Sequence, residues 1–293
     1  MKLNFKLGML AIMLIVNACN PEKKEEKTAS EAFEKAQKET EEQIKKVVNE
    51  LPAPSEIPFL LMQTGVEFNK SLTHDLSQVS SYTGNNTKAA LNLGIYATDV
   101  TYLSAYEKSQ EALNYIAAIR PLADQLSLSS SFDPQTVERF EKNLSNTDSM
   151  AAIVNMAVAN AERHLKATDR PKVAALLLAG SFIEGLYIAT ALIENYPSDI
   201  LPEDTRNLIL IPLVKVIIDQ EEPLKDLIEL LKSVEKDDMV QKLLVELELL
   251  KGQYKKLNVK ELMDQGKGDQ LLKDEALDNI TNQAGRTRDL LTS

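Results

Sequence analysis

The sequence predicts an all-α protein, a multi-helix bundle around a buried central helix at about residues 171–195. The 293 residues include only 10 glycines and 11 prolines, which leaves long stretches free to form helices. Apolar residues recur at helical spacing along most of the chain, and no segment shows the alternation of a strand. Between Val173 and Ile193 the only charged residue is Glu184, so this stretch is apolar on every side.

Prolines bound the central helix, with Pro171 at its start and Pro197 after its end. Because it is apolar all round, other elements must cover it. Its small residues would let neighbouring backbones approach closely; they are Gly180, Ser181, Gly185 and Ala189. A membrane span has a similar length, but Glu184 near the midpoint would cost about 2.5–3.5 kcal/mol there. We expect a buried core helix, with a span as the alternative.

The first segment, residues 1–18, has the pattern of a secretory signal peptide. Lys2 and Lys6 come first, and an apolar run at residues 7–16 follows that is too short to cross a bilayer. The segment is followed by Cys19, the only cysteine of the chain, so no intramolecular disulfide can form.

The residues Val16-Asn17-Ala18-Cys19 resemble the lipobox of bacterial lipoproteins, although Asn17 departs from the small or apolar residue usual there. The resemblance implies cleavage before Cys19 and acylation of that cysteine, for example with palmitate. More than one acyl chain gives a stable membrane anchor. An ordinary signal peptide with an incidental cysteine is the alternative.

Residues 19–54 are the predicted lipid-anchored, charged tether and stalk helix. Asn20, in place of the aspartate that marks inner-membrane retention, favours an outer-membrane location. The run PEKKEEK at residues 21–27 resembles the charged tether of surface-exported lipoproteins in Bacteroidota, and a plain solvated linker is the alternative. We expect a lipid-anchored protein of the outer membrane, on the periplasmic side or at the cell surface.

Residues 55–293 are predicted to form a single helical-bundle domain. Helix starts are expected after Ser55, near Thr87, at Asp133-Pro134 and near Thr147. The helical pattern from 87 to 126 is long, and Pro121 is expected to kink it. His74 lies off the apolar stripe of the first helix and is expected to be solvated.

The last third of the chain shows four further helical patterns. Pro212 should bend or break the apolar run at 208–218. Two amphipathic helices, at about 224–234 and 240–250, follow, and a last helix is predicted at 271–291.

Charge and residue counts exclude several kinds of function. The formal net charge of -11 would repel a phosphate backbone, so nucleic acid is not an expected partner. With one cysteine and the two histidines His74 and His164, a His/Cys zinc site is excluded. Neither histidine follows a glutamate by three residues, as a di-iron bundle requires. We expect no metal and no cofactor.

Asp99 and Glu184 are the acids that lie deep within apolar helical stretches. Two such carboxylates could perform acid/base chemistry or hold a metal, or they could accept hydrogen bonds in a structural network. The candidate residues of this buried network or pocket are Asp99, Tyr102, Tyr106, Arg163, Ser181, Glu184 and Tyr187.

Two segments, NLGIYATDVTYLSAYEKSQEALNYIAAI and LAGSFIEGLYIAT, resemble stretches of an uncharacterised family of exported helical proteins of Bacteroidota, from about residue 60 to 195. The resemblance implies an envelope location and transfers no catalytic residue. Imelysin-like proteins carry a Gly-x-His-x-x-Glu motif, but Phe182 stands where the histidine would be between Gly180 and Glu184.

These observations lead to three hypotheses. The first is a lipid-anchored envelope protein, not an enzyme, that binds or scaffolds an envelope protein partner. The second is a helical lipoprotein that binds a small ligand, of a chemistry the sequence does not identify, in an internal pocket near Asp99 and Glu184. The third is an enzyme or metal-binding protein that uses these acids.

Overall fold

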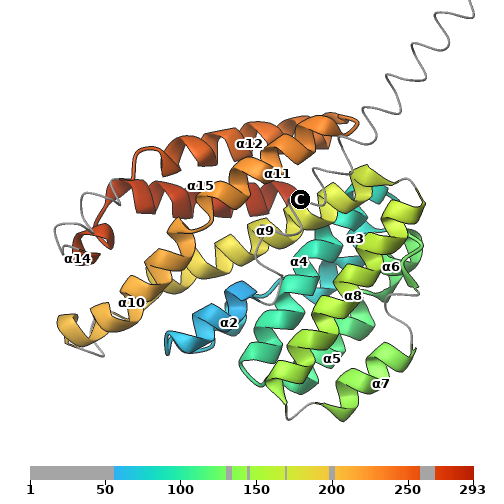
Figure 1. Cartoon of the computed structure of the whole chain (residues 1–293), viewed down its shortest axis with the longest axis horizontal. Helices are drawn as coiled ribbons and strands as arrows, with labels where there is room; N and C mark the ends of the chain where they lie inside the picture. Colours follow the sequence, from blue (N-terminus) through green and yellow to red (C-terminus); the bar gives the residue numbers. More distant parts are fainter. Residues whose placement is uncertain (1–55, 130–133, 144–145, 169, 198–201, 258–267) are drawn as a thin grey trace, which may run out of the picture. The chain divides into compact units, whose positions relative to one another are not determined.

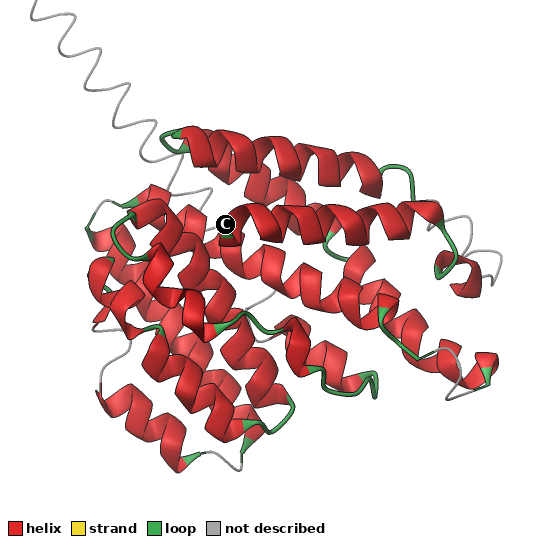
Figure 2. Ribbon diagram, turned by 180° about the vertical axis from the view of Figure 1, so that it is seen from behind, coloured by secondary structure: helices red, strands yellow, loops and turns green. Residues whose placement is uncertain are grey.

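The computed structural model describes residues 56–129, 134–143, 146–168, 170–197, 202–257 and 268–293. All of them belong to one compact unit, Glu39–Ser293. They form helices joined by turns, with no strand among them, which confirms the all-α prediction (Figures 1 and 2). The predicted signal peptide at 1–18 and the tether at 19–54 lie outside the described residues.

The first half of the domain contains two long helices, α4 and α8, and several shorter ones. In chain order the elements are α2 (Glu56–Gln63), the 3-10 helices η1 (Lys70–Leu72) and η2 (Leu76–Gln78), α3 (Val79–Tyr82), α4 (Asn86–Ala105), α5 (Ser109–Ala118), α6 (Arg120–Gln125), α7 (Pro134–Lys142) and α8 (Thr147–Ala167).

The second half contains the longest helix, α9, and the C-terminal helices that pack on it. The elements are α9 (Pro171–Glu194), α10 (Glu203–Ile218), α11 (Glu221–Ser233), α12 (Asp238–Tyr254), α14 (Gly268–Leu271) and α15 (Glu275–Thr292).

Two boundaries differ from the prediction. The expected helix at 87–126 is divided into α4, α5 and α6, and the first break lies at Glu107, whose φ of 58° is left-handed. The sequence predicts a bend or a break at Pro212, and there is no break, because α10 continues through it. Proline at 212 removes the hydrogen bond to the carbonyl of Leu208, and Leu208 is 76% exposed, so solvent can reach that side of the helix.

Helix α9 is the buried central helix that the sequence predicts. It contacts α2, α4, α8, α10, α11 and α15. By length and composition it is the one described helix that could cross a membrane, but 83% of its apolar window is buried inside the domain. From Ala174 to Leu192 every side chain is buried except that of Tyr187. The core-helix prediction is confirmed.

The backbones of α4 and α9 touch where they cross. A Cβ atom added at Gly94 would lie 2.1 Å from the carbonyl oxygen of Leu177, and one added at Gly180 would lie 1.9 Å from that of Leu91. The Ser181 hydroxyl donates to the Gly94 carbonyl across this contact, at 3.1 Å. The crossing therefore requires glycine at both positions.

Replacing either crossing glycine with alanine should destabilise the domain. A methyl group would overlap backbone atoms that cannot rotate away, so we expect Gly94→Ala and Gly180→Ala to lower the free energy of unfolding by about 3 kcal/mol or more. Gly285→Ala is the control, because Gly285 lies within α15 and an added Cβ would meet nothing within 4 Å. It should be neutral or stabilising by up to about 1 kcal/mol. Urea unfolding measures all three, and near-parental stability of the crossing variants would contradict the close contact.

Candidate functional site

The two buried acids predicted from the sequence meet an arginine of the C-terminal helix. Asp99 on α4 and Glu184 on α9 are both 0% exposed. Arg288 on α15 binds Glu184 through two nitrogens, with Nε 2.6 Å from Oε2 and Nη2 2.9 Å from Oε1. This bidentate geometry is the strong form of an arginine–carboxylate pair.

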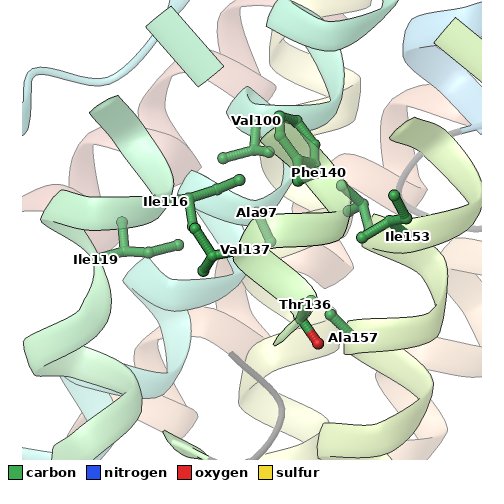
Figure 3. A pocket seen from close by; sticks show the side chains of 10 residues that line it. Ala97, Val100, Ile116, Ile119, Thr136, Val137, Phe140, Ile153 and Ala157 are labelled. Atoms are coloured by element: carbon green, nitrogen blue, oxygen red, sulfur yellow. The ribbon is translucent and has the colours of Figure 1, made fainter. Parts of the chain in front are cut away.

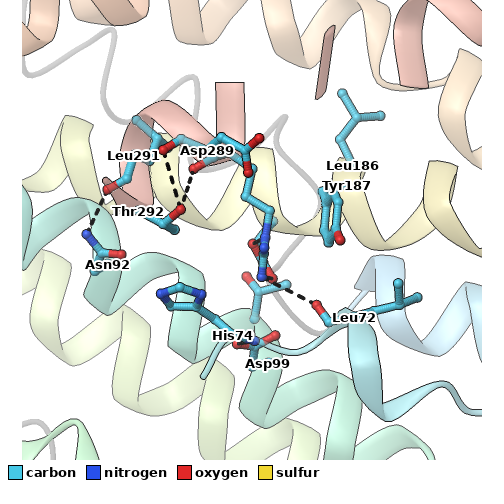
Figure 4. A network of polar contacts seen from close by, with 12 residues as sticks. Leu72, His74, Asn92, Asp99, Leu186, Tyr187, Asp289, Leu291 and Thr292 are labelled. Carbon is cyan, nitrogen blue, oxygen red and sulfur yellow. Dashed lines mark hydrogen bonds and ion pairs between the residues drawn. The ribbon is translucent and has the colours of Figure 1, made fainter. Parts of the chain in front are cut away.

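The guanidinium of Arg288 has further contacts that fix its position. It lies over the Tyr187 ring, 4.2 Å from the ring centroid, and Nη2 donates to the Leu72 carbonyl at 3.4 Å. The positive charge thus rests on an aromatic face and pairs with one carboxylate (Figure 4). These contacts tie α15, α9 and η1 together.

Asp99 is the less completely satisfied acid. Its Oδ2 accepts a hydrogen bond from the backbone N–H of His74 at 2.9 Å, whereas Oδ1 is buried without a donor. The Glu184 carboxylate is its acidic neighbour, and while both acids are ionised neither can donate a hydrogen bond to the other. A proton on one of the acids resolves the conflict, since the protonated acid then donates to the other.

The electrostatics place that proton on Asp99. Burial raises the pKa of Asp99 well above its ordinary value, and the negative charge of Glu184 raises it further. Burial also raises the pKa of Glu184, but the charge and hydrogen bonds of Arg288 act in the opposite direction. The directions of these effects therefore favour a proton on Asp99 over one on Glu184.

His74 is buried, so the prediction that it is solvated is wrong. Its side chain is 8% exposed, and Nε2 lies 2.7 Å from the Tyr82 hydroxyl. Burial and the charge of Arg288 lower the pKa of His74 to about 4, so the ring is neutral near pH 7. The residue lies between η1 and η2, where the helical periodicity used for the prediction does not apply.

The predicted tyrosines Tyr102 and Tyr106 bind a different segment. The Tyr102 hydroxyl accepts from the Asn69 N–H at 2.9 Å, and the Tyr106 hydroxyl donates to the Val66 carbonyl at 3.0 Å. Both rings pack against Phe68, with centroids 5.3 and 5.6 Å away. These contacts hold the segment 66–69, which precedes η1, against α4.

The remaining candidates divide between the network and its surroundings. Tyr187 belongs to the network through Arg288. Ser181 lies at the helix crossing and bonds to Gly94. Arg163 is exposed on α8, so the expectation that it satisfies the buried acids is wrong.

Sequence reasoning missed Arg288, although a pattern pointed to it. Arg288 stands four residues after Ala284 and three before Leu291, on the apolar stripe of α15. A cation on a buried stripe needs an anionic partner, and Arg288 pairs with Glu184.

A small cavity lies apart from the acids, among α4, α5, α7 and α8. Its volume is about 30 Å³, and its lining is almost wholly apolar (Figure 3). The lining residues are Ala97, Val100, Ile116, Ile119, Thr136, Val137, Phe140, Ile153, Val154 and Ala157. By volume it would hold roughly two water molecules, and it offers no set of converging polar groups.

No group of three or more His, Cys, Asp or Glu side chains that could hold a metal ion occurs among the described residues. Comparison of the chain with protein-family models, curated proteins and solved structures finds no match.

A double-mutant cycle measures what the ion pair contributes. Arg288→Met should lower the free energy of unfolding by about 3–5 kcal/mol, because it leaves the Glu184 carboxylate buried and unpaired, and Glu184→Gln should lower it less, because glutamine removes the charge but still accepts a hydrogen bond from Arg288. The double variant should lose less than the sum of the two, since no unpaired charge remains. Arg163→Ala is the control and should change stability by less than about 0.5 kcal/mol. Additive single effects in urea unfolding would contradict direct pairing.

Two substitutions of Glu184 test whether this acid has a structural or a functional role. Leucine cannot accept hydrogen bonds from Arg288 or Asp99, whereas glutamine can, so Glu184→Leu should melt clearly below Glu184→Gln. Calorimetry or thermal circular dichroism measures the difference. If both variants melt near the parental temperature, Glu184 does not have a structural role.

Proposed function

We propose that this protein is a lipid-anchored protein of the cell envelope whose helical domain acts by binding or scaffolding and not by catalysis. The observation that carries the proposal is the order Val16-Asn17-Ala18-Cys19 directly after a charged start and a short apolar run. This order provides both an export signal and an acylation site.

The burial of α9 supports attachment through Cys19. The helix long enough to cross a membrane is covered by the rest of the domain, so an acyl chain at Cys19 is the attachment that fits the body. We place the anchor in the outer membrane, with the domain on the periplasmic side or at the cell surface. The proposed partner is another envelope protein, and the net charge of -11 argues against nucleic acid.

The geometry of the acids supports a non-catalytic role. Asp99 and Glu184 are closed off from solvent, where Glu184 binds Arg288 and Asp99 accepts a hydrogen bond from the His74 backbone. A general acid or base must reach a substrate, and neither carboxylate does so in this conformation. The described cavity lies among other residues, so the small-ligand and enzyme hypotheses gain no support from it.

The outer face of α12 provides one surface for a partner. Val245 and Leu249 stand one turn apart on this helix and are 59% and 47% exposed. Neighbouring exposed apolar side chains on one helix face are common at protein contacts.

Removal of the acylation site should release the protein from membranes. We expect full-length Cys19→Ala to move from the detergent-rich to the aqueous phase in detergent phase partitioning, because no acyl chain can be attached. Asn17→Ala keeps the cysteine and should remain in the detergent-rich phase. If Cys19→Ala stays as membrane-bound as the parent while its helical content is unchanged, the lipid-anchor proposal is wrong.

A further inference from the structure

The C-terminal turn, residues 288–293, is attached to the N-terminal half of the domain by polar contacts. Asn92 Nδ2 donates to the Leu291 carbonyl at 3.0 Å, and the Tyr82 hydroxyl donates to the Thr292 carbonyl at 3.0 Å. Lys88 Nζ donates to the Ser293 carbonyl oxygen at 2.7 Å. Together with Arg288 these bonds bring the end of α15 to α3 and α4, as Figure 4 shows for Asn92 and Leu291.

The rest of α15 is held by packing. Its buried apolar side chains are Ala276, Leu277, Ile280, Ala284 and Leu291, and α15 packs along α9 and α12. Only Leu291 among these side chains lies in the C-terminal turn. The turn therefore depends on hydrogen bonds, on the Arg288 ion pair and on one fully buried apolar side chain, Leu291, and its release would leave the other apolar contacts of α15 in place.

Charge balance at the acids decides whether the ion pair is satisfied. Asp99 and Glu184 face one arginine, so a single proton makes the buried cluster neutral and its absence leaves one uncompensated negative charge. The other groups that face the cluster are His74 and Asp75 between η1 and η2, Tyr82 on α3, Tyr96 and Tyr102 on α4, Tyr115 on α5 and Tyr187 on α9.

These surrounding groups do not titrate in competition with the acid pair. Burial raises the pKa of all five tyrosines. His74 is already neutral, because its pKa is lowered to about 4. Hydrogen bonds from Ser77 lower the pKa of Asp75, so this exposed side chain is ionised.

We propose that one proton shared by Asp99 and Glu184 holds the C-terminal turn on α4, and that loss of this proton releases the turn as a conformational switch. The fully buried carboxyl pair, the unpaired Asp99 oxygen and the single Arg288 carry this inference. It is independent of the proposed membrane anchor.

The direction of the pH effect follows from the proton count. The docked state binds a proton that the released state, with its acids in water, gives up near the ordinary aspartate pKa of about 3.9. Docking is therefore fully stabilised below that value and weakens as pH rises toward the raised pKa of the pair. Within this range the released fraction should increase by up to about tenfold per pH unit.

Hydrogen exchange of the full chain between pH 5 and 9 tests the proposal, with rates corrected for the intrinsic pH dependence of exchange. Amides of α15 after Ala284 should lose protection as pH rises, while amides of α5 serve as the reference and keep theirs. In Asp99→Asn the amide accepts from the His74 N–H and donates to Glu184 without a titratable proton. This variant should therefore keep α15 protected at every pH. Glu184→Gln should leave α15 less protected throughout.

Three outcomes would overturn the switch. Equal pH dependence of α15 exchange in the parent and in Asp99→Asn would show that the Asp99 proton is not responsible. Loss of protection in α5 together with α15 would show global unfolding in place of a released turn. If Asp99→Asn does not fold, carboxyl carbon NMR of the parent decides, and a spectrum showing ionised Asp99 at pH 6 would reject the shared proton.

Discussion

The direct contact between the backbones of α4 and α9 is the constraint on which the rest of the structure depends. Gly94 and Gly180 remove the side chains that would separate the two helices, so the helices meet at backbone distance. Asp99 stands five residues after the first glycine and Glu184 four residues after the second. A close crossing therefore brings the two carboxyl groups together about one turn beyond it, in a place that other helices cover.

Two acids in such a place require compensation, and the way it is supplied determines where the C-terminal helix lies. Burying a lone carboxylate is costly unless it is paired or neutralised. One proton neutralises Asp99 and one arginine pairs with Glu184. Because Arg288 belongs to α15, the requirement for a counter-charge at the helix crossing fixes the end of the chain against the first long helix. The polar network thus helps to determine how the helices pack.

Periodicity and local residue chemistry could predict the helices, but not the partners within the network. The apolar run after Pro171 predicts the central helix, and the small residues at 180 and 181 predict that a neighbouring backbone approaches it closely, as α4 does. Arg163 was the arginine among the candidate residues, yet the arginine that pairs with Glu184 is Arg288, 104 residues away in sequence. His74 was misjudged because it lies between short 3-10 helices, where no repeat indicates which side is buried. Contacts between residues far apart in sequence, and burial in irregular segments, leave no periodic pattern in the sequence from which they could be predicted.

Asp99 and Glu184 are buried beneath α15, so any chemical role of these acids depends on the position of this helix. Both carboxylates are 0% exposed and their neighbours fill the space around them, so a substrate or ion could reach them only after Arg288 had moved. Arg288 cannot leave without breaking its two bonds to Glu184 and uncovering an ionised acid. A chemical function at Asp99 or Glu184 and a conformational function of the C-terminal turn would consequently share one first step, the separation of α15 from α4.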